Sequence, residues 1–444
     1  EGYHDILQRK RTIIGEDGKL QEVDNLPNNR LIDNQFALMV DQKTNYLVGK
    51  PFTVTCKNKT YADLLTKVFD KRFNRLLKYV CEDALKGGIG WLFPYYGDDG
   101  KLAFKHFPAQ EILPFWTDDD HTILDCAIRL YPQEVWNGLT KEIVERVEIF
   151  KHDGIWRYVY DGTTLTPDEQ LGEHENYFSI DDGEETVELN WERIPLIPFK
   201  YNKQEIPLIR RVKTLQDGIN TMLSDFENNM QEDARNTILI LKNYDGENLG
   251  EFRRNLATYG AVKVRDDGGV ETLTVEINSE NFNSILKLFK DKLIENARGY
   301  NAKDDRMGNN PNQMNIQSMY SDIDLDANGM ETEFQAAFEE LLWFINQDFA
   351  NTGRGDYDGE EVTIVFNRDM LINESEAIEN CSKSVGILSN ETIVAQHPWT
   401  TDVDLELERL QKEKEEAMAQ AQEYAGAFGN VQKDDPDGNE GGDE

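Results

Sequence analysis

Four acidic residues have the spacing of a calcium-binding loop. Asp322, Asp324, Asp326 and Glu333 stand at positions 1, 3, 5 and 12 of an EF-hand pattern, whose oxygens would ligate Ca²⁺. Position 6, where the loop needs glycine for its sharp turn, is Ala327. The same residues fall inside a long helical pattern, and we therefore expect no calcium site here.

No phosphate-binding or hydrolytic motif is present. Gly49-Lys50 runs directly into Pro51 in place of a G-x-x-x-x-G-K-[ST] loop, and neither G-x-S-x-G nor H-E-x-x-H occurs. Adjacent carboxylates such as Asp118 and Asp119 could do acid–base chemistry, but close pairs arise by chance among 84 acidic residues. The sequence therefore predicts no catalytic residue, no metal or cofactor site, and a protein that is not an enzyme.

The composition indicates a folded and very acidic protein. The 444 residues include 47 Lys or Arg and 84 Asp or Glu, a formal charge of −37, with 10% aromatic residues. Such a charge argues against a sequence-reading nucleic-acid binder, whose footprint is basic, although not against a protein that encloses DNA without gripping it. The four cysteines lack C-x-x-C spacing, and no apolar run approaches the ~18 residues of a membrane helix. We expect a soluble, intracellular protein of several domains.

The elements predicted in the first half are mainly β-strands. Apolar spacing predicts helices over residues 30–48 and 61–86. Alternating residues and turn signals predict a β-rich region up to residue 199, with strands at 122–131, 143–150 and 155–160 among them. Within it, residues 161–192 carry eleven Asp or Glu and no Lys or Arg, which is typical of a solvated acidic loop or edge hairpin; a docking surface for a basic partner is the alternative.

Long helices dominate the second half. Pro207 opens a helix that runs to Arg235, and further helices are predicted over residues 280–300 and 314–349, the last with a kink at Gly329. Between the first two lies a small β-α-β-β unit, with a hairpin turn at residues 266–269. Shorter helices follow near residues 375–386, 390–396 and 402–425. Such long helices with single apolar stripes need neighbours along their whole length.

Three segments and the order of these elements resemble a known protein family. The segments are Asn28–Val54, Glu82–Trp116 and Ser389–Leu410. They are similar to the tailed-phage portal proteins of the SPP1 type, as is the order of β-rich region, long helix, small insert, long helix, loop and long helix. The resemblance covers residues 28–412.

The resemblance implies an α+β portal fold with a β-rich wing, long stem helices, a small α/β clip, a long kinked wing helix and a short helical crown. The implied boundaries are 1–207 for the N-terminal and wing region, 208–236 for the first stem helix, 237–279 for the clip, 280–301 for the second stem helix, 302–313 for the tunnel loop, 314–400 for the long wing helix and its β/α return, 401–430 for the crown helix and 431–444 for an acidic disordered tail.

The resemblance also implies a function. Portals of this family form a ring-shaped channel, usually dodecameric, at one capsid vertex, through which double-stranded DNA is packaged and ejected without sequence specificity. They have no hydrolytic activity and need no cofactor, because the terminase hydrolyses ATP. The implied partners are further copies of the chain, DNA, the terminase large subunit, a head-completion or adaptor protein, and the major capsid and scaffolding proteins. The implied location is the virion, with the host cytoplasm during assembly, and no membrane.

Three groups of residues carry the site predictions. The residues expected to pack subunits together are Leu215, Ile219, Phe226, Phe289 and Phe334. The docking surface of the clip is expected at Glu247, Glu251, Arg253 and Arg254, for which a solvated helix face is the alternative. The tunnel loop is expected to present Lys303, Asp304, Asp305, Arg306, Asn309 and Asn310 to DNA, for which a surface connector outside the ring is the alternative.

Two other classes of function stay open on the sequence alone. One is a structural adaptor protein with the same helices and no ring, which a mass measurement in solution would distinguish. The other is a metal-dependent nuclease that uses the acidic clusters, which a Mg²⁺-dependent cleavage assay would test.

Overall fold

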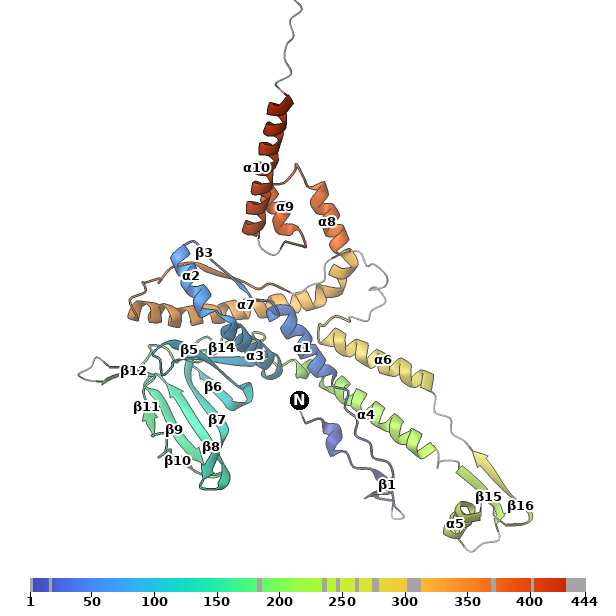
Figure 1. Cartoon of the computed structure of the whole chain (residues 1–444). Helices are drawn as coiled ribbons and strands as arrows, with labels where there is room; N and C mark the ends of the chain where they lie inside the picture. Colours follow the sequence, from blue (N-terminus) through green and yellow to red (C-terminus); the bar gives the residue numbers. More distant parts are fainter. Residues whose placement is uncertain are drawn as a thin grey trace, which may run out of the picture. The chain divides into compact units, whose positions relative to one another are not determined.

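The computed structural model describes residues 3–15, 18–181, 186–233, 238–244, 248–259, 263–273, 279–301, 313–368, 373–400 and 403–428. These residues form two units, one within Glu1–Asn301 and Tyr320–Asp369, the other within Ala302–Met319 and Met370–Glu444. Figure 1 shows their helices and strands. The chain is a mixed α+β protein, as the sequence predicts.

The first unit begins with a short helix, a hairpin and a segment without regular structure. Helix η1 spans Asp5–Gln8, and strands β1 (Thr12–Ile14) and β2 (Leu20–Glu22) pair antiparallel. Helix α1 spans Gln35–Val48. It begins later than the predicted residue 30 because the Asn34 side chain caps it, accepting a hydrogen bond from the Ala37 N–H at 3.0 Å.

The helix predicted over residues 61–86 is two helices. Helix α2 spans Lys59–Val68 and helix α3 spans Lys71–Gly87. Asp70 starts the second one, because its carboxylate accepts the N–H groups of Arg72 at 2.8 Å and Phe73 at 2.9 Å. The apolar spacing continues across the break, which is why periodicity alone predicted a single helix.

Helix α3 covers a small antiparallel sheet. Strands β4 (Ile89–Tyr96), β5 (Leu102–Phe107) and β14 (Ile197–Lys200) lie in the order β14-β4-β5. The helix approaches β4 so closely that a Cβ at Gly90 would lie 2.1 Å from the carbonyl oxygen of Val80. Only glycine fits at this position.

A larger antiparallel sheet lies beside it. It is formed by the strands that come after the short helix η2 (Ala109–Glu111) in the chain. Neighbouring strands in the sheet have the order β10-β9-β8-β7-β6, and β11 also pairs with β9. The bounds are β6 (Ile112–Trp116), β7 (Leu124–Asn137), β8 (Thr140–Lys151), β9 (Gly154–Tyr160), β10 (Leu165–Pro167) and β11 (His174–Glu175). The hairpin of β7 and β8 continues to the Asn137↔Thr140 pair, which makes both strands longer than predicted.

The acidic segment at 161–192 contributes edge strands, as one of its two interpretations predicted. Besides β10 and β11 it forms the hairpin of β12 (Phe178–Asp181) and β13 (Thr186–Leu189). Asp168 is an exception to its solvated character. It is 1% exposed and pairs with the Arg146 guanidinium.

The hydrophobic core of this region lies between the two sheets. Its buried side chains come from both, and include Trp91, Phe107, Ala127, Phe150 and Leu196. Phe93 extends the cluster, its ring centroid 5.2 Å from that of Phe107 and 5.5 Å from that of Phe150. Aromatic pairs at such distances contribute about 0.5–1.5 kcal/mol beyond area burial.

The long helices and the insert between them follow. Helix α4 spans Ile209–Asp233 and helix α6 spans Ser279–Asn296. The insert has β15 (Ile238–Tyr244), α5 (Leu249–Tyr259) and β16 (Val264–Leu273). The predicted hairpin turn at residues 266–269 is wrong. These residues form an irregularity inside β16, which pairs with β15 on both sides of it, and Asp267 takes up the left-handed φ of 63°.

Helix α7 spans Gln313–Asn351, and its residues from Tyr320 onward belong to the first unit. Strand β17 (Val362–Val365) then pairs with β3 (Thr53–Cys56), which joins the two ends of this part of the chain. An aromatic cluster fixes α7 here. The Phe338 ring lies 5.1 Å from Phe52, 5.7 Å from Phe199 and 6.0 Å from Phe366.

The second unit contains the predicted C-terminal helices. They are α8 (Glu374–Lys383), α9 (Asn390–Gln396) and α10 (Val403–Phe428). Asn373 and Ser389 cap the first two. The Gln313 N–H donates to Glu376 at 2.9 Å, and the Asn373 N–H donates to the Gln313 side chain at 3.0 Å, so the start of α7 is tied to α8. None of the helices within the described ranges has the length and apolarity that a membrane span requires.

Candidate functional site

Helices α4 and α6 form an antiparallel pair, side by side in Figure 1. Phe226 stacks on Phe282 with ring centroids 4.0 Å apart. Further along, Gly218 faces Phe289, since a Cβ at Gly218 would lie 3.0 Å from the Phe289 ring. The positions rise along one helix as they fall along the other. Stacked rings at one end and a close approach at the other hold the two helices together as a rod.

A ladder of polar side chains covers another face of α4. Gln216, Asn220, Ser224 and Asn228 follow one another at four-residue steps and are at most 2% exposed. Their oxygens accept backbone N–H groups from the N-terminal segment: Asn29 on Asn228 at 2.7 Å, Leu31 on Ser224 at 2.9 Å, Asp33 on Asn220 at 3.0 Å and Phe36 on Gln216 at 2.9 Å.

The spacing explains why the ladder works. Four residues of helix advance about 6.0 Å, and two residues of extended chain advance about 6.6 Å. Alternate N–H groups at residues 29, 31 and 33 therefore meet successive rungs. We call residues 29–36 the strap. If the strap shifted along α4, its buried N–H groups would lose their acceptors, which is costly. The rungs therefore fix the register of the strap on the helix.

A single buried carboxylate joins four elements of the first unit. Asp326 of α7 pairs with Lys43 of α1 at 2.7 Å, accepts the Tyr201 hydroxyl at 2.7 Å, and pairs with Arg211 at the start of α4 at 3.0 Å. Arg298, just after α6, lies 3.8 Å away. We call these five residues the hub. It connects the base of both long helices to α7.

The charges of the hub are unequal, three cations to one anion. Burial alone would raise the pKa of Asp326, but Lys43, Tyr201 and Arg211 together lower it below its ordinary value. Burial lowers the pKa of Lys43, with repulsion from Arg211 and Arg298, although Asp326 opposes this. The aspartate is therefore firmly ionised and is what holds the cations in place.

The acidic residues with calcium-loop spacing are used in other ways. They lie in the continuous helix α7 and not in a loop. Asp324 accepts the Tyr46 hydroxyl at 2.6 Å and pairs with Arg368 at 2.6 Å, and Asp326 belongs to the hub. Across the described part of the chain, no group of three or more His, Cys, Asp or Glu is arranged to hold a metal ion.

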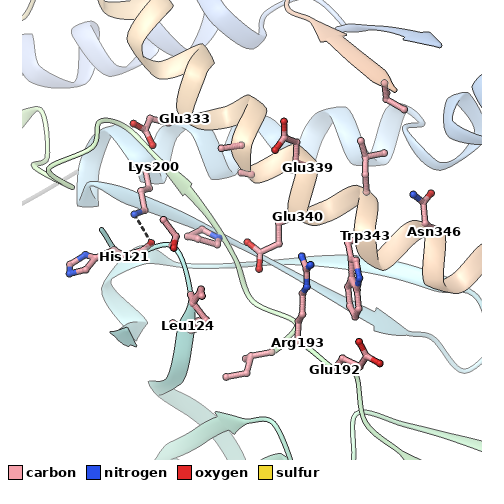
Figure 2. A pocket seen from close by; sticks show the side chains of 18 of the residues that line it. His121, Leu124, Glu192, Arg193, Lys200, Glu333, Glu339, Glu340, Trp343 and Asn346 are labelled. Carbon is pink, nitrogen blue, oxygen red and sulfur yellow. Dashed lines mark hydrogen bonds between the residues drawn. The ribbon is translucent and has the colours of Figure 1, made fainter. Parts of the chain in front are cut away.

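A cavity of about 1130 Å³ lies between α7, the edge strand β14 and the residues before β17 (Figure 2). Burial raises the pKa of the Glu340 carboxyl to about 7, although Arg193 opposes the shift. Arg193 itself stacks on the Trp343 ring at 4.6 Å. Lys200 donates to the His121 carbonyl at 2.9 Å and pairs with Glu205 at 2.9 Å. These contacts are structural, and none of them places a nucleophile next to a base.

The residues predicted to pack subunits divide by burial. Ile219 and Phe334 are fully buried in the single chain, and Phe334 packs on Phe199 at 5.1 Å, so both side chains make their contacts within the subunit. Leu215, Phe226 and Phe289 are partly exposed on the paired long helices.

The other predicted site residues are only partly described. In the insert, Arg254 is exposed and Glu251 partly exposed on α5, whereas Glu247 lies outside the described residues, as does the side chain of Arg253. The tunnel-loop residues Lys303 to Asn310 also lie outside them. Sequence reasoning missed the ladder and the hub. The four-residue polar repeat from Gln216 to Asn228 was the available signal for the ladder, and the hub had none.

Comparison with known proteins agrees with this architecture of paired long helices. The model of the family described as "Phage portal protein, SPP1 Gp6-like" matches residues 1–420. The chain belongs to the SPP1-type phage portal family. It is 30% identical over 444 residues to the portal protein of Bacillus phage SPP1, covering 99% of this chain and 85% of that protein. It is 26% identical over 424 residues to the portal protein of Clostridium phage phiCD119, covering 92% of this chain and 89% of that protein.

As a portal protein, the chain is a structural component of the capsid vertex and not an enzyme. Portals assemble as an oligomeric ring that contacts DNA and other head proteins, and the ring is the channel for packaging and ejecting the genome. The nuclease alternative is excluded by this membership. The hub, the ladder and the paired helices hold the elements of one subunit together.

Proposed function

We propose that twelve copies of this portal protein form the ring, with α4 and α6 as the stem that surrounds DNA. The observation that carries the proposal is the antiparallel rod of α4 and α6, fixed at Phe226–Phe282 and Gly218–Phe289. The rod exposes Met230, Ile285 and Leu288 by 59%, 45% and 53%. Exposed apolar side chains of this size mark contact surfaces, and neighbouring rods in a ring would cover them.

The insert at residues 237–279 is the clip in this proposal. A two-stranded sheet such as β15–β16 is marginally stable alone, so neighbouring clips would complete it. Helix α5, with Glu251, Arg253 and Arg254, would then dock first the terminase large subunit and later the head-completion or adaptor protein. The β-rich part of residues 1–207 and residues 314–400 would form the wing, facing capsid and scaffolding proteins.

The remaining parts complete the channel. Residues 302–313, between α6 and α7, would form the tunnel loop at its narrowest point, and the helix of 401–430 the crown. The charge of −37 per chain suits such a channel. A basic wall would bind DNA by counterion release and stall it, whereas acidic walls repel it over a screening length of about 8 Å.

Light scattering coupled to size exclusion tests the ring directly. We expect a mass near twelve times 51.2 kDa without DNA, and closed rings in negative stain. A monomer or dimer at all concentrations would overturn the proposal. On intact rings, Arg253→Glu with Arg254→Glu should weaken binding of the terminase or adaptor, and unchanged binding would remove α5 from the docking surface.

A further inference from the structure

Helix α3 presents a row of cations that its own chain does not use. Its buried face packs on the small sheet through Phe73, Leu77 and Val80. On the opposite face, Lys71, Arg75 and Lys78 follow one another at four- and three-residue steps and share one surface, and Arg72 lies beside this row. We call these four residues the basic ridge.

The ridge is unusual in so acidic a protein. Among the residues that the structure describes, none carries a carboxylate within ion-pair distance of Lys71, Arg72, Arg75 or Lys78. Charged residues elsewhere along α3 do have partners. Lys86 pairs with Glu82 at 3.4 Å, and the Asp70 carboxylate caps the start of the helix. With 84 acidic residues in the chain, four adjacent cations without a counter-ion indicate a partner outside the subunit.

The complementary surface lies on the same protein. Eight Asp or Glu residues line the large cavity, against three Lys or Arg. Lys200 and Lys203 already pair with Glu205 and Asp120. Figure 2 shows Glu333, Glu339 and Glu340 on α7 beside this space. Within the described ranges these three carboxylates have no ion pair, and burial raises the pKa of Glu340 to about 7, although Arg193 opposes the shift.

The two surfaces are separate, because no residue of α3 lines the cavity. Helix α3 packs mainly on β4 and β5, whereas β14 lines the cavity through Pro198 and Lys200. In the order β14-β4-β5, β14 and β5 are opposite edges. A closed ring needs a head-to-tail interface in which two different faces of each subunit meet. The basic ridge and the acidic cavity satisfy this requirement.

We infer that the basic ridge of α3 docks against the acidic cavity rim of the neighbouring subunit. The inference rests on the proposed ring. Arg72 and Arg75 would supply the main contacts, because a guanidinium binds carboxylates through two parallel hydrogen bonds. The occupant is a second copy and not DNA, since the surface of complementary charge, the acidic lining of the cavity, is carried by every copy of this chain. Opposite charges would then set the register between subunits that otherwise repel each other.

A charge exchange tests the contact. Arg72→Glu with Arg75→Glu should raise the subunit concentration at which rings form by about tenfold or more, because like charges then face each other. Glu333→Arg with Glu339→Arg should do the same. The chain that carries all four substitutions should recover ring formation, since each reversed ridge meets a reversed rim. Raising the salt concentration should reduce the defect of either pair alone.

The controls separate this inference from the ring itself. Lys412→Glu with Lys414→Glu makes the same change of net charge on exposed α10 residues and should leave assembly unchanged. If wild-type protein forms no ring, the proposed function fails. If the wild type and the ridge variant form rings equally, or the fourfold variant is not rescued, the ridge contact is wrong. Normal rings that lose DNA would also overturn it, because the ridge would then bind phosphates.

Discussion

At the scale of single residues, Asp326 is the group on which most depends. Among the residues that the structure describes, it is the one carboxylate that pairs with Lys43, and Lys43 is 5% exposed. Asp326→Ala leaves that ammonium buried and unpaired, which should lower the free energy of unfolding by about 3–5 kcal/mol. Denaturant unfolding of the variant would measure this loss. Asp322→Ala, at an exposed position of the same helix, is the matched control and should cost little.

The hub also predicts the direction of an acid effect. The pKa of Asp326 is lowered in the folded protein, so its contribution is complete above the ordinary aspartate value of 3.8 and is lost as pH falls below it. Asp326→Asn should therefore flatten the stability profile on that acid side. An identical acid slope in the wild type and the variant would mean that the hub does not depend on this charge.

At the scale of elements, the ladder on α4 predicts that the strap can be loosened alone. Asn220→Ala with Ser224→Ala removes the acceptors of the Asp33 and Leu31 N–H groups. Each buried donor left without an acceptor costs about 1–3 kcal/mol. Hydrogen exchange should then speed up at those two amides while the core of α4 stays protected. Thr221→Ala, exposed on the same helix, should change neither rate.

How far the sequence predicts these elements depends on where their signals lie. The apolar stripe of α4 repeats locally, so the helix was predicted within two residues at each end. The start of α1 was placed too early, because the strap is held by rungs 180 or more residues away. The break between α2 and α3 has a local signal, Asp70, which the continuing apolar pattern outweighed. Residues 266–269 were predicted as a hairpin turn between two strands, whereas they lie within the single strand β16.

At the scale of the whole molecule, the sequence predicted the class of site better than its residues. Membership of the portal family follows from order and length of elements, which the resemblance captured. Phe334 was predicted at a subunit interface from its place on a stripe, yet the stripe faces Phe199 inside the chain. A periodic pattern shows that a face is buried and does not show which partner buries it.

The tunnel loop carries the last prediction, at the scale of the ring and its DNA. Its sequence places Lys303 and Arg306 beside Asp304 and Asp305, next to Gly308-Asn309-Asn310-Pro311. Glycine and asparagine tolerate left-handed backbone, so such a loop can change shape at low cost. If this segment lines the channel as proposed, its two cations per subunit would offer weak, salt-sensitive phosphate contacts, which would allow DNA to slide while resisting backward slippage.

Deleting Asp305–Asn310 should therefore leave rings of normal mass but reduce packaging or retention of DNA, measured as nuclease-protected genome per particle. Lys303→Ser with Arg306→Ser keeps the length of the loop and removes only its cations. This second variant should package DNA but lose it more readily than the wild type. The difference between the two proteins should be largest at low salt, because the wild-type contacts are strongest there. If the deletion variant packages and holds DNA at the wild-type level, residues 302–313 do not form the constriction, and the channel must be narrowest elsewhere along the stem.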